Sequence, residues 1–239
     1  MESSARPGVR GEAVEDYLKA IYELSAAADP GSVGTAQRVG TQDLAQHMRV
    51  SPASASRMLK HLDELGYVDH ELYRGATLTG AGERAALEVI RHHRLIELYL
   101  HDKLGYSWDE VHAEAERLEH YISEEFEARI YDVLGRPEVD PHGDVIPTLE
   151  GGLPPERAQS LASQLPLVDA PPESLVVVQR VPSSDPEKLR YLREVGVVPG
   201  EQVRVLERLP FGGGVRMRTK TGERTLGEVL ASEIRVSQA

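Results

Sequence analysis

The sequence predicts a mainly α-helical fold with a small β part: an N-terminal winged helix-turn-helix, a helical segment and a C-terminal β-barrel. Apolar residues repeat at helical spacing through much of residues 11–134. A helix start at Ser51-Pro52 is followed by a hairpin pattern around Arg74-Gly75, and β-branched segments alternate with turns after residue 175. The expected domains are the winged helix-turn-helix (1–80), the helical domain (81–140), a proline-rich linker (141–172) and the barrel (173–239).

Helix starts and turn residues define the N-terminal elements. Thr41 is expected to cap a short helix. Ser51 offers a capping oxygen and Pro52 suits the first helical position, so a further helix begins there. The order helix, helix, turn, helix, hairpin is that of a winged helix-turn-helix. The expected elements are a helix over 11–25, a loop over 26–39, a helix from Thr41, a helix from Pro52 to Gly66, and a hairpin over 67–79.

The remaining chain is expected to contain long helices, a linker and strands. Two helical patterns have apolar faces that must be buried, either against a second copy of the chain or against an intramolecular neighbour. A proline-rich stretch then precedes β-branched segments separated by turns. The expected elements are helices over 82–104 and 109–134, a short helix over 156–164 within the linker, and strands over 175–178, 202–206 and 214–218.

Composition excludes several classes of protein. The 239 residues include no cysteine, which removes disulfides, zinc–thiolate sites and thiol nucleophiles and fits a reducing cytosol. The first residues lack the apolar core of a signal peptide, and no apolar run approaches the roughly 18 residues of a membrane helix. We therefore expect a cytoplasmic protein without a membrane partner.

The negative charge is concentrated in one region. The net charge of −12 argues against nucleic acid as a partner, because the phosphate backbone favours Lys and Arg. Residues 38–74, however, carry five basic and five acidic side chains, whereas residues 109–136 carry nine acidic side chains and three arginines. The acidic block is either a solvated helix face or a cation site.

Histidine and glutamate recur at helical spacing in the two long helices. Side chains three or four residues apart lie on one face of a helix, so each helix is expected to display a group of donors. Imidazole and carboxylate without sulfur suit Mn²⁺, Fe²⁺, Zn²⁺ or Co²⁺. Surface residues at chance spacing are the alternative interpretation. The donors are His93 and Glu97 in the first helix, and His112, Glu116, Glu119 and His120 in the second.

Several segments together resemble the diphtheria toxin repressor and manganese transport regulator family. The resemblance implies a dimeric, divalent-metal-dependent transcription repressor with an SH3-like C-terminal domain. It covers nearly the whole chain and is most specific in the helical motifs. The segments are residues 16–24, 51–57, 73–75, 93–97 and 111–120, with Pro141-His142-Gly143 and Ile146-Pro147 further on.

Carried over by position, the resemblance implies two metal sites. The iron-dependent members also place an acid where Asp185 stands, but an amide three residues later is here Lys188, which is a poor ligand. The barrel therefore offers Asp185 as a candidate ligand without the second donor of the iron-dependent members. The primary site would consist of Asp16, Glu116, Glu119 and His120, and the ancillary site of His93, Glu97 and His112.

Two departures within the family bear on the choice of metal. Iron-type members have Met and Cys where this chain has Asp16 and Glu116, and hard oxygen donors favour Mn²⁺. Manganese-type members have a further glutamate at the position of Lys19, so the second site is expected to follow the iron-type arrangement. The resemblance thus implies a Mn²⁺ sensor, with Fe²⁺ as the alternative and Co²⁺, Zn²⁺ or Cd²⁺ as substitutes in vitro.

The expected macromolecular partners are double-stranded DNA with a palindromic operator and a second copy of the chain. The short side chains of the recognition helix make few base contacts, so DNA shape is expected to contribute to specificity. Two other classes stay open at this point: a dinuclear metal hydrolase, and a winged-helix regulator with an organic effector. The expected DNA-binding residues are Ser51, Ala53, Ser54, Arg57, Lys60 and Arg74.

Overall fold

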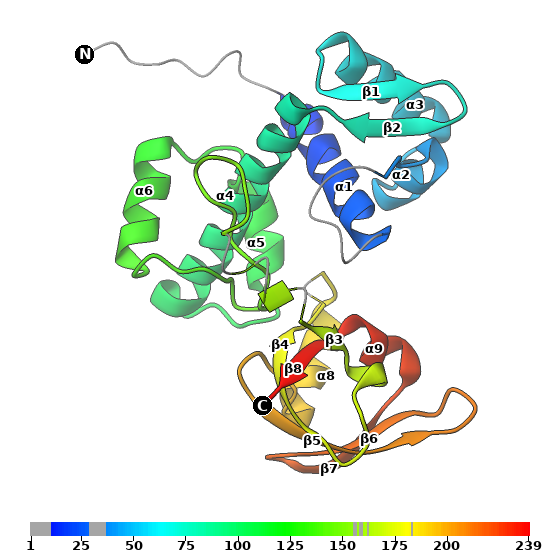
Figure 1. The fold of residues 1–239 in the computed structure, drawn as a ribbon. Coiled ribbons are helices and arrows are strands. Elements are labelled where there is room, and N and C mark those ends of the chain that lie inside the picture. The colour runs from blue at the N-terminus through cyan, green and yellow to red at the C-terminus, as the bar shows by residue number, and fades with distance from the viewer. Residues whose placement is uncertain (1–10, 29–36, 155–156, 158–159, 162, 183) are drawn as a thin grey trace. The chain divides into compact units, whose positions relative to one another are not determined.

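The computed structural model describes residues 11–28, 37–154, 157, 160–161, 163–182 and 184–239 (Figure 1). These residues form two compact units, Met1–His92 with Pro147–Gly152, and His93–Ile146 with Leu153–Ala239. Parts of the expected loop over 26–39 and of the expected short helix over 156–164 lie outside the described residues. None of the helices in the described part of the chain combines the length and apolar character that a membrane crossing needs.

The first unit is a winged helix-turn-helix, as predicted. Leu18, Ile21, Leu44, Leu59 and Leu62 are fully buried in its core. Its elements are α1 (Glu12–Ala28), α2 (Thr41–His47), α3 (Pro52–Glu64), β1 (Val68–Glu71), β2 (Gly75–Leu78) and the first part of α4 (Gly80–Leu104).

Helix starts in this unit agree with the sequence in one case and not in the other. The Ser51 hydroxyl accepts a hydrogen bond from the Ser54 amide and caps α3. The prediction for Thr41 was wrong, because Thr41 is the first helical residue and Gly40 occupies the N-cap position. A glycine in this position supplies no side-chain cap, so the hydrogen bonds within α2 and the burial of Leu44 hold the helix.

The second unit contains the rest of α4, then α5 (Val111–Leu118) and α6 (Glu124–Val133). The single helix expected over 109–134 is wrong, since the chain turns between Glu119 and Ser123. Ser123 caps α6 by accepting a hydrogen bond from the Phe126 amide, and acidic residues occupy the first turn, where the helix dipole favours them. Apolar periodicity continues across this break, which explains why the sequence suggested one helix.

The C-terminal part is a small β-barrel, which confirms the predicted fold class. Its six-stranded sheet has the order β3-β8-β4-β5-β6-β7, with antiparallel neighbours. The sequence predicted three of these strands and missed the others together with both helices. The elements are β3 (Leu165–Pro166), the 3₁₀ turn η1 (Leu167–Asp169), β4 (Leu175–Arg180), α8 (Pro186–Val195), β5 (Gln202–Leu209), β6 (Gly214–Thr219), β7 (Gly222–Leu226), α9 (Glu228–Glu233) and β8 (Arg235–Gln238).

The barrel is fastened to the helical part of its own unit. Trp108, which precedes α5, is buried in the apolar core of the barrel, and its indole N–H donates to the Pro141 carbonyl at 3.0 Å. The Val181 amide donates to the His142 carbonyl at 3.0 Å. Residues 139–146 therefore form a buried turn between α4 and β4, and this turn positions part of the site described next.

Candidate metal centre

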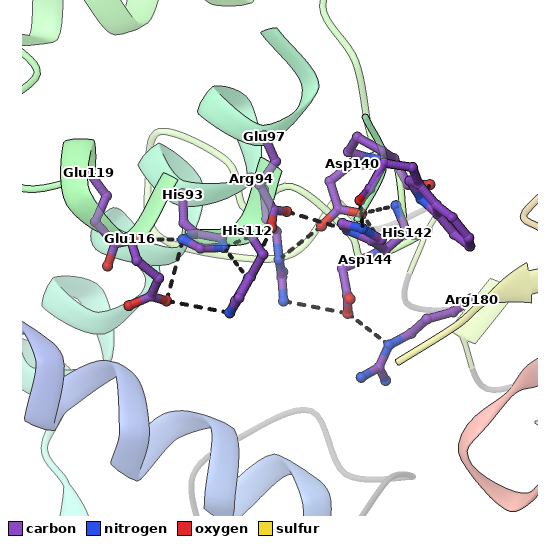
Figure 2. Close-up of polar contacts among 12 residues, drawn as sticks. His93, Arg94, Glu97, His112, Glu116, Glu119, Asp140, His142, Asp144 and Arg180 are labelled. Carbon is purple, nitrogen blue, oxygen red and sulfur yellow. Dashed lines mark hydrogen bonds and ion pairs between the residues drawn. The ribbon is translucent and has the colours of Figure 1, made fainter. Parts of the chain in front are cut away.

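Helices α4 and α5 bring His93, Glu97 and His112 together (Figure 2). His93 Nε2 lies 2.9 Å from Glu97 Oε1 and 3.1 Å from His112 Nδ1, and His112 Nδ1 lies 3.1 Å from Glu97 Oε1. These are hydrogen-bond distances, and they place the three donor atoms close enough together to bind a single ion.

Glu97 is held as an anion inside the protein, with only 1% of its surface exposed. Burial raises the pKa of a carboxyl group, but the imidazoles of His93, His112 and His142 outweigh burial here and hold the pKa of Glu97 well below its usual value. A buried carboxylate surrounded by three imidazoles is a group that either protons or a metal cation can satisfy.

The second nitrogen of His93 faces a different set of carboxylates. His93 Nδ1 hydrogen-bonds Glu119 and lies 3.7 Å from Glu116 Oε1. The sequence predicted that Glu119 and His120 lie on one continuous helix. Instead, Glu119 is the C-terminal cap of α5 and His120 follows in the turn. The turn nevertheless leaves Glu119 buried and beside His93.

A second triad, missed by the sequence analysis, consists of Glu97, Asp140 and His142 (Figure 2). All three residues are buried. Asp140 Oδ1 accepts the amides of His142 at 2.8 Å and Asp144 at 3.0 Å, which shapes the turn. Gly143 completes it with a φ of +91°, and a Cβ there would lie 1.9 Å from the Gln179 carbonyl oxygen.

One nitrogen of His142 points into this triad without a hydrogen bond. His142 Nε2 lies 3.1 Å from the Trp108 carbonyl oxygen, which can only accept, so the proton belongs on Nε2 in the neutral ring. Nδ1 then carries a lone pair, is fully buried and has no hydrogen-bond partner among the described residues. It lies 3.6 Å from Glu97 Oε2. Burial lowers the pKa of His142, but Glu97 and Asp140 outweigh burial and raise this pKa, so either a proton on Nδ1 or a metal cation can lie between the two atoms.

Asp140 and Asp144 extend the cluster toward the barrel. Burial, with the charges of Asp144 and Glu97, raises the pKa of Asp140 to about 7. The guanidinium of Arg94 lies 3.8 Å from Asp140 Oδ2 and 3.6 Å from Asp144 Oδ1. The Nε of Arg180, on β4, lies 2.8 Å from the same Asp144 oxygen. Asp144 thus forms ion pairs with two arginines, whereas Asp140 also lies beside Glu97 and His142.

The other predicted ligands are spread over both units. Asp16 lies on α1 in the first unit. Asp185 caps α8 by accepting the amides of Glu187 and Lys188, and the Lys188 ammonium binds Glu233 at 2.6 Å. Among the described residues, the possible metal-binding groups do not include Asp185.

Helical spacing predicted the pair His93 and Glu97, and the resemblance to the family joined His112 to this pair. Asp140 and His142 carry no such periodicity. Their signal was the Pro141-His142-Gly143 segment, which contributed to the resemblance but was not interpreted as a source of ligands.

The predicted DNA-binding residues lie on or beside α3 and in the hairpin. Ala53, Arg57 and Lys60 are exposed along one side of α3. The hydroxyls of Ser51 and Ser54 hydrogen-bond each other at 3.0 Å, and Arg57 reaches Ser54 Oγ at 3.4 Å. Lys60 forms an exposed ion pair with Glu64 at 3.8 Å, and Arg74 forms one with Glu71 at 3.0 Å. Exposed pairs are weak, so another anion can readily replace either glutamate.

The fold and its donor set define a winged-helix protein with a buried cluster of groups that could hold a divalent metal. The domain models of the iron dependent repressors match in two parts, the N-terminal DNA binding domain at residues 11–76 and the metal binding and dimerisation domain at 79–148. A FeoA domain, the SH3-like barrel, matches residues 165–238. The chain therefore belongs to the iron-dependent repressor family, whose members are metal-dependent DNA-binding transcriptional repressors and not enzymes.

Relatives named for iron and for manganese both resemble this chain. The iron-dependent repressor IdeR of Mycobacterium tuberculosis (strain ATCC 25618 / H37Rv) is 33% identical over 95% of this chain and 97% of its own length. The transcriptional regulator MntR of Lysinibacillus sphaericus is 32% identical over 57% of this chain and 91% of its own. A solved manganese-dependent transcriptional repressor in complex with manganese is 37% identical, with a TM-score of 0.80 over 95% of this chain and 100% of that one.

Proposed function

We propose that this protein is a Mn²⁺-activated repressor that acts as a homodimer on palindromic operators of metal-homeostasis genes in the cytoplasm. The observation that carries the proposal is the cluster of imidazole and carboxylate donors around the buried anion Glu97, in a chain without a cysteine. Fe²⁺ is the alternative activator, because it accepts the same donors and because relatives named for iron are as similar.

The primary site is proposed to consist of Asp16, Glu116, Glu119 and His120, all hard donors. A bound divalent cation supplies positive charge that offsets repulsion among these carboxylates. Since Asp16 belongs to α1, Glu116 to α5 and the other two to the turn after α5, such a site would couple the DNA-binding unit to the helical one. Coupling of this kind would select a spacing of roughly 34–36 Å between two recognition helices.

For the ancillary cation we propose the two triads that share Glu97. The triad with His93 and His112 is supported by the mutual approach of its three donor atoms, and the triad with Asp140 and His142 by the buried Nδ1 of His142, which has no hydrogen-bond partner among the described residues. Asp185 is the weaker candidate, since its carboxylate already caps α8. Arg57 is proposed to read a base, with Ser51, Ala53, Ser54, Lys60 and Arg74 at the backbone.

DNA binding is expected to require the metal. With Mn²⁺, the protein should bind a duplex from the promoter of its own gene about 100-fold more tightly than with a chelator, which is within the usual range of allosteric coupling. A gel shift with Mn²⁺, Fe²⁺ under anaerobic conditions, and chelator measures this. Equal affinity in chelator and in Mn²⁺ contradicts the proposal, and stronger activation by Fe²⁺ selects the alternative.

Asp140→Asn should separate a structural role from a ligand role. Because the pKa of Asp140 is raised to about 7, its contribution to stability is fully present below 3.8 and is lost as the pH rises through about 7. At pH 8 without metal, the asparagine variant should therefore melt at the same temperature as the wild type or higher. With saturating Mn²⁺ the order should reverse, because the wild type gains about 5–10 °C and the variant gains less.

Asp144→Asn is the matched control for that comparison, since Asp144 is an adjacent carboxylate that pairs with Arg94 and Arg180. Its Mn²⁺-induced rise in melting temperature should equal that of the wild type. An equal rise in Asp140→Asn shows that Asp140 does not bind the ion.

A further inference from the structure

The tip of the β1–β2 hairpin, the wing, displays an aromatic side chain that the fold does not use. Tyr73 is 96% exposed and Leu72 beside it is 66% exposed. Tyr73 also has a φ of +66°, a left-handed conformation in which the Cβ of a non-glycine residue is crowded. A large ring in an unfavourable backbone conformation, buried against nothing in its own unit, suggests a function outside the fold.

The backbone that carries Tyr73 is held against the segment before α2. Glu71 binds Arg38 from the segment before α2. A Cβ on Gly75 would lie 2.2 Å from the Val39 carbonyl oxygen, so the hairpin backbone lies directly against the segment that leads into α2. The tip therefore cannot swing freely relative to the helix-turn-helix.

The wing is also fixed to the recognition helix. The strand β1 lies beside α3 (Figure 1). The His70 amide on β1 donates to Asp63 on α3 at 3.0 Å, and the Thr79 hydroxyl donates to the Gly66 carbonyl just after α3 at 2.8 Å. A duplex that engages α3 thus meets a wing of defined position. The side chain next to Tyr73 is Arg74, whose exposed pairing with Glu71 a phosphate can replace.

We propose that Tyr73 contacts DNA beside each half-site, its ring against deoxyribose in the minor groove while Arg74 binds the adjacent phosphate. The ring offers an apolar face for the sugars, and apolar side chains are a recurrent means of contact in the minor groove. Such a contact is uncharged and independent of base hydrogen bonds, so it adds affinity without adding to the salt dependence. The proposal rests on the DNA-binding function but not on the identity of the metal.

The test uses the Mn²⁺-loaded full chain and the duplex that it selects from a random-sequence pool, with affinity followed by fluorescence anisotropy. Tyr73→Asn keeps a residue that tolerates the left-handed conformation, so the hairpin should persist. We expect its affinity to fall about fivefold to tenfold and Tyr73→Phe to stay within about twofold. The slope of log affinity against log salt should not change in Tyr73→Asn, whereas Arg74→Ala should reduce it by about 1.

Phe211 provides a matched control, because it is a fully exposed aromatic residue with a φ of +56° at the β5–β6 turn of the barrel. Phe211→Asn should bind like the wild type. Unchanged affinity of Tyr73→Asn, or an equal loss in Phe211→Asn, overturns the proposal while metal-dependent DNA binding stands. If the loaded wild type selects no duplex, the DNA-binding function itself fails. The proposal is also overturned if the wild type forms an oligomer that Tyr73→Asn does not form, while both bind DNA with the same affinity. That result would assign the ring to a contact between proteins.

Discussion

Glu97→Gln is expected to weaken Mn²⁺ binding at the ancillary centre by about 100-fold or more. Glu97 is the only anion in the triad with His93 and His112, and it is also part of the triad with Asp140 and His142. Removing one charge therefore affects both groups, which exceeds the tenfold to 100-fold loss typical of outer-shell changes. Glutamine has the same shape and can still hydrogen-bond the imidazoles, so the variant should fold.

Trp108 provides the measurement. It is the only tryptophan in the chain and stacks on His142, with ring centroids 5.5 Å apart. Paramagnetic Mn²⁺ bound beside His142 should quench its fluorescence, so titration of wild type and Glu97→Gln compares affinities at this centre. Quenching at the same Mn²⁺ concentrations in both proteins contradicts the assignment of Glu97.

Two further variants decide between the triads. His112→Gln removes a donor from the first triad only, and Asp140→Asn removes one from the second only. Loss of quenching in His112→Gln alone assigns the ion to the first triad, and loss in Asp140→Asn alone assigns it to the second. Loss in both indicates that the two groups act as one centre through Glu97.

The features that could be predicted from the sequence are those that depend on local interactions. The pair His93 and Glu97 was found because helical periodicity fixes which side chains share a face of a helix, and the resemblance to the family added His112 to that pair. Ser51-Pro52 and the turn at Arg74-Gly75 were found because capping and turn chemistry are local. The winged helix-turn-helix and the barrel followed from the order of such local signals.

What the sequence missed depends on contacts between distant segments. Asp140 and His142 meet Glu97 only because the turn at Gly143 packs against β4 and Trp108 enters the barrel. The break after Leu118 was missed because Ser123, which caps α6, lies within an otherwise continuous helical pattern. Asp185 stood where the iron-dependent members have an acid, but its role as a helix cap depends on where α8 begins.

The choice of metal is expected to change in the double variant Asp16→Met, Glu116→Cys. Both substitutions place sulfur where this chain has anionic oxygen, and thioether and thiolate donors favour softer ions. Both new residues are tolerated in helices, so the fold should persist. Operator binding by the variant should respond about tenfold less to Mn²⁺ relative to Fe²⁺ or Co²⁺ than binding by the wild type. Single substitutions are less informative, because a mixed donor set fits neither class of ion well.

Anaerobic titration of operator binding with each metal compares the wild type with the double variant. Glu114→Cys is the control, because it adds a thiol to α5 at a residue that pairs with Arg117 and lies outside the possible metal-binding groups of the described residues. It should keep the wild-type order of metal potencies. If the double variant remains folded and dimeric and also keeps that order, Asp16 and Glu116 do not set selectivity. Asp16 would then be the first ligand to abandon, because its assignment rests on resemblance, whereas Glu116 lies 3.7 Å from His93 Nδ1 and 3.9 Å from His112 Nε2.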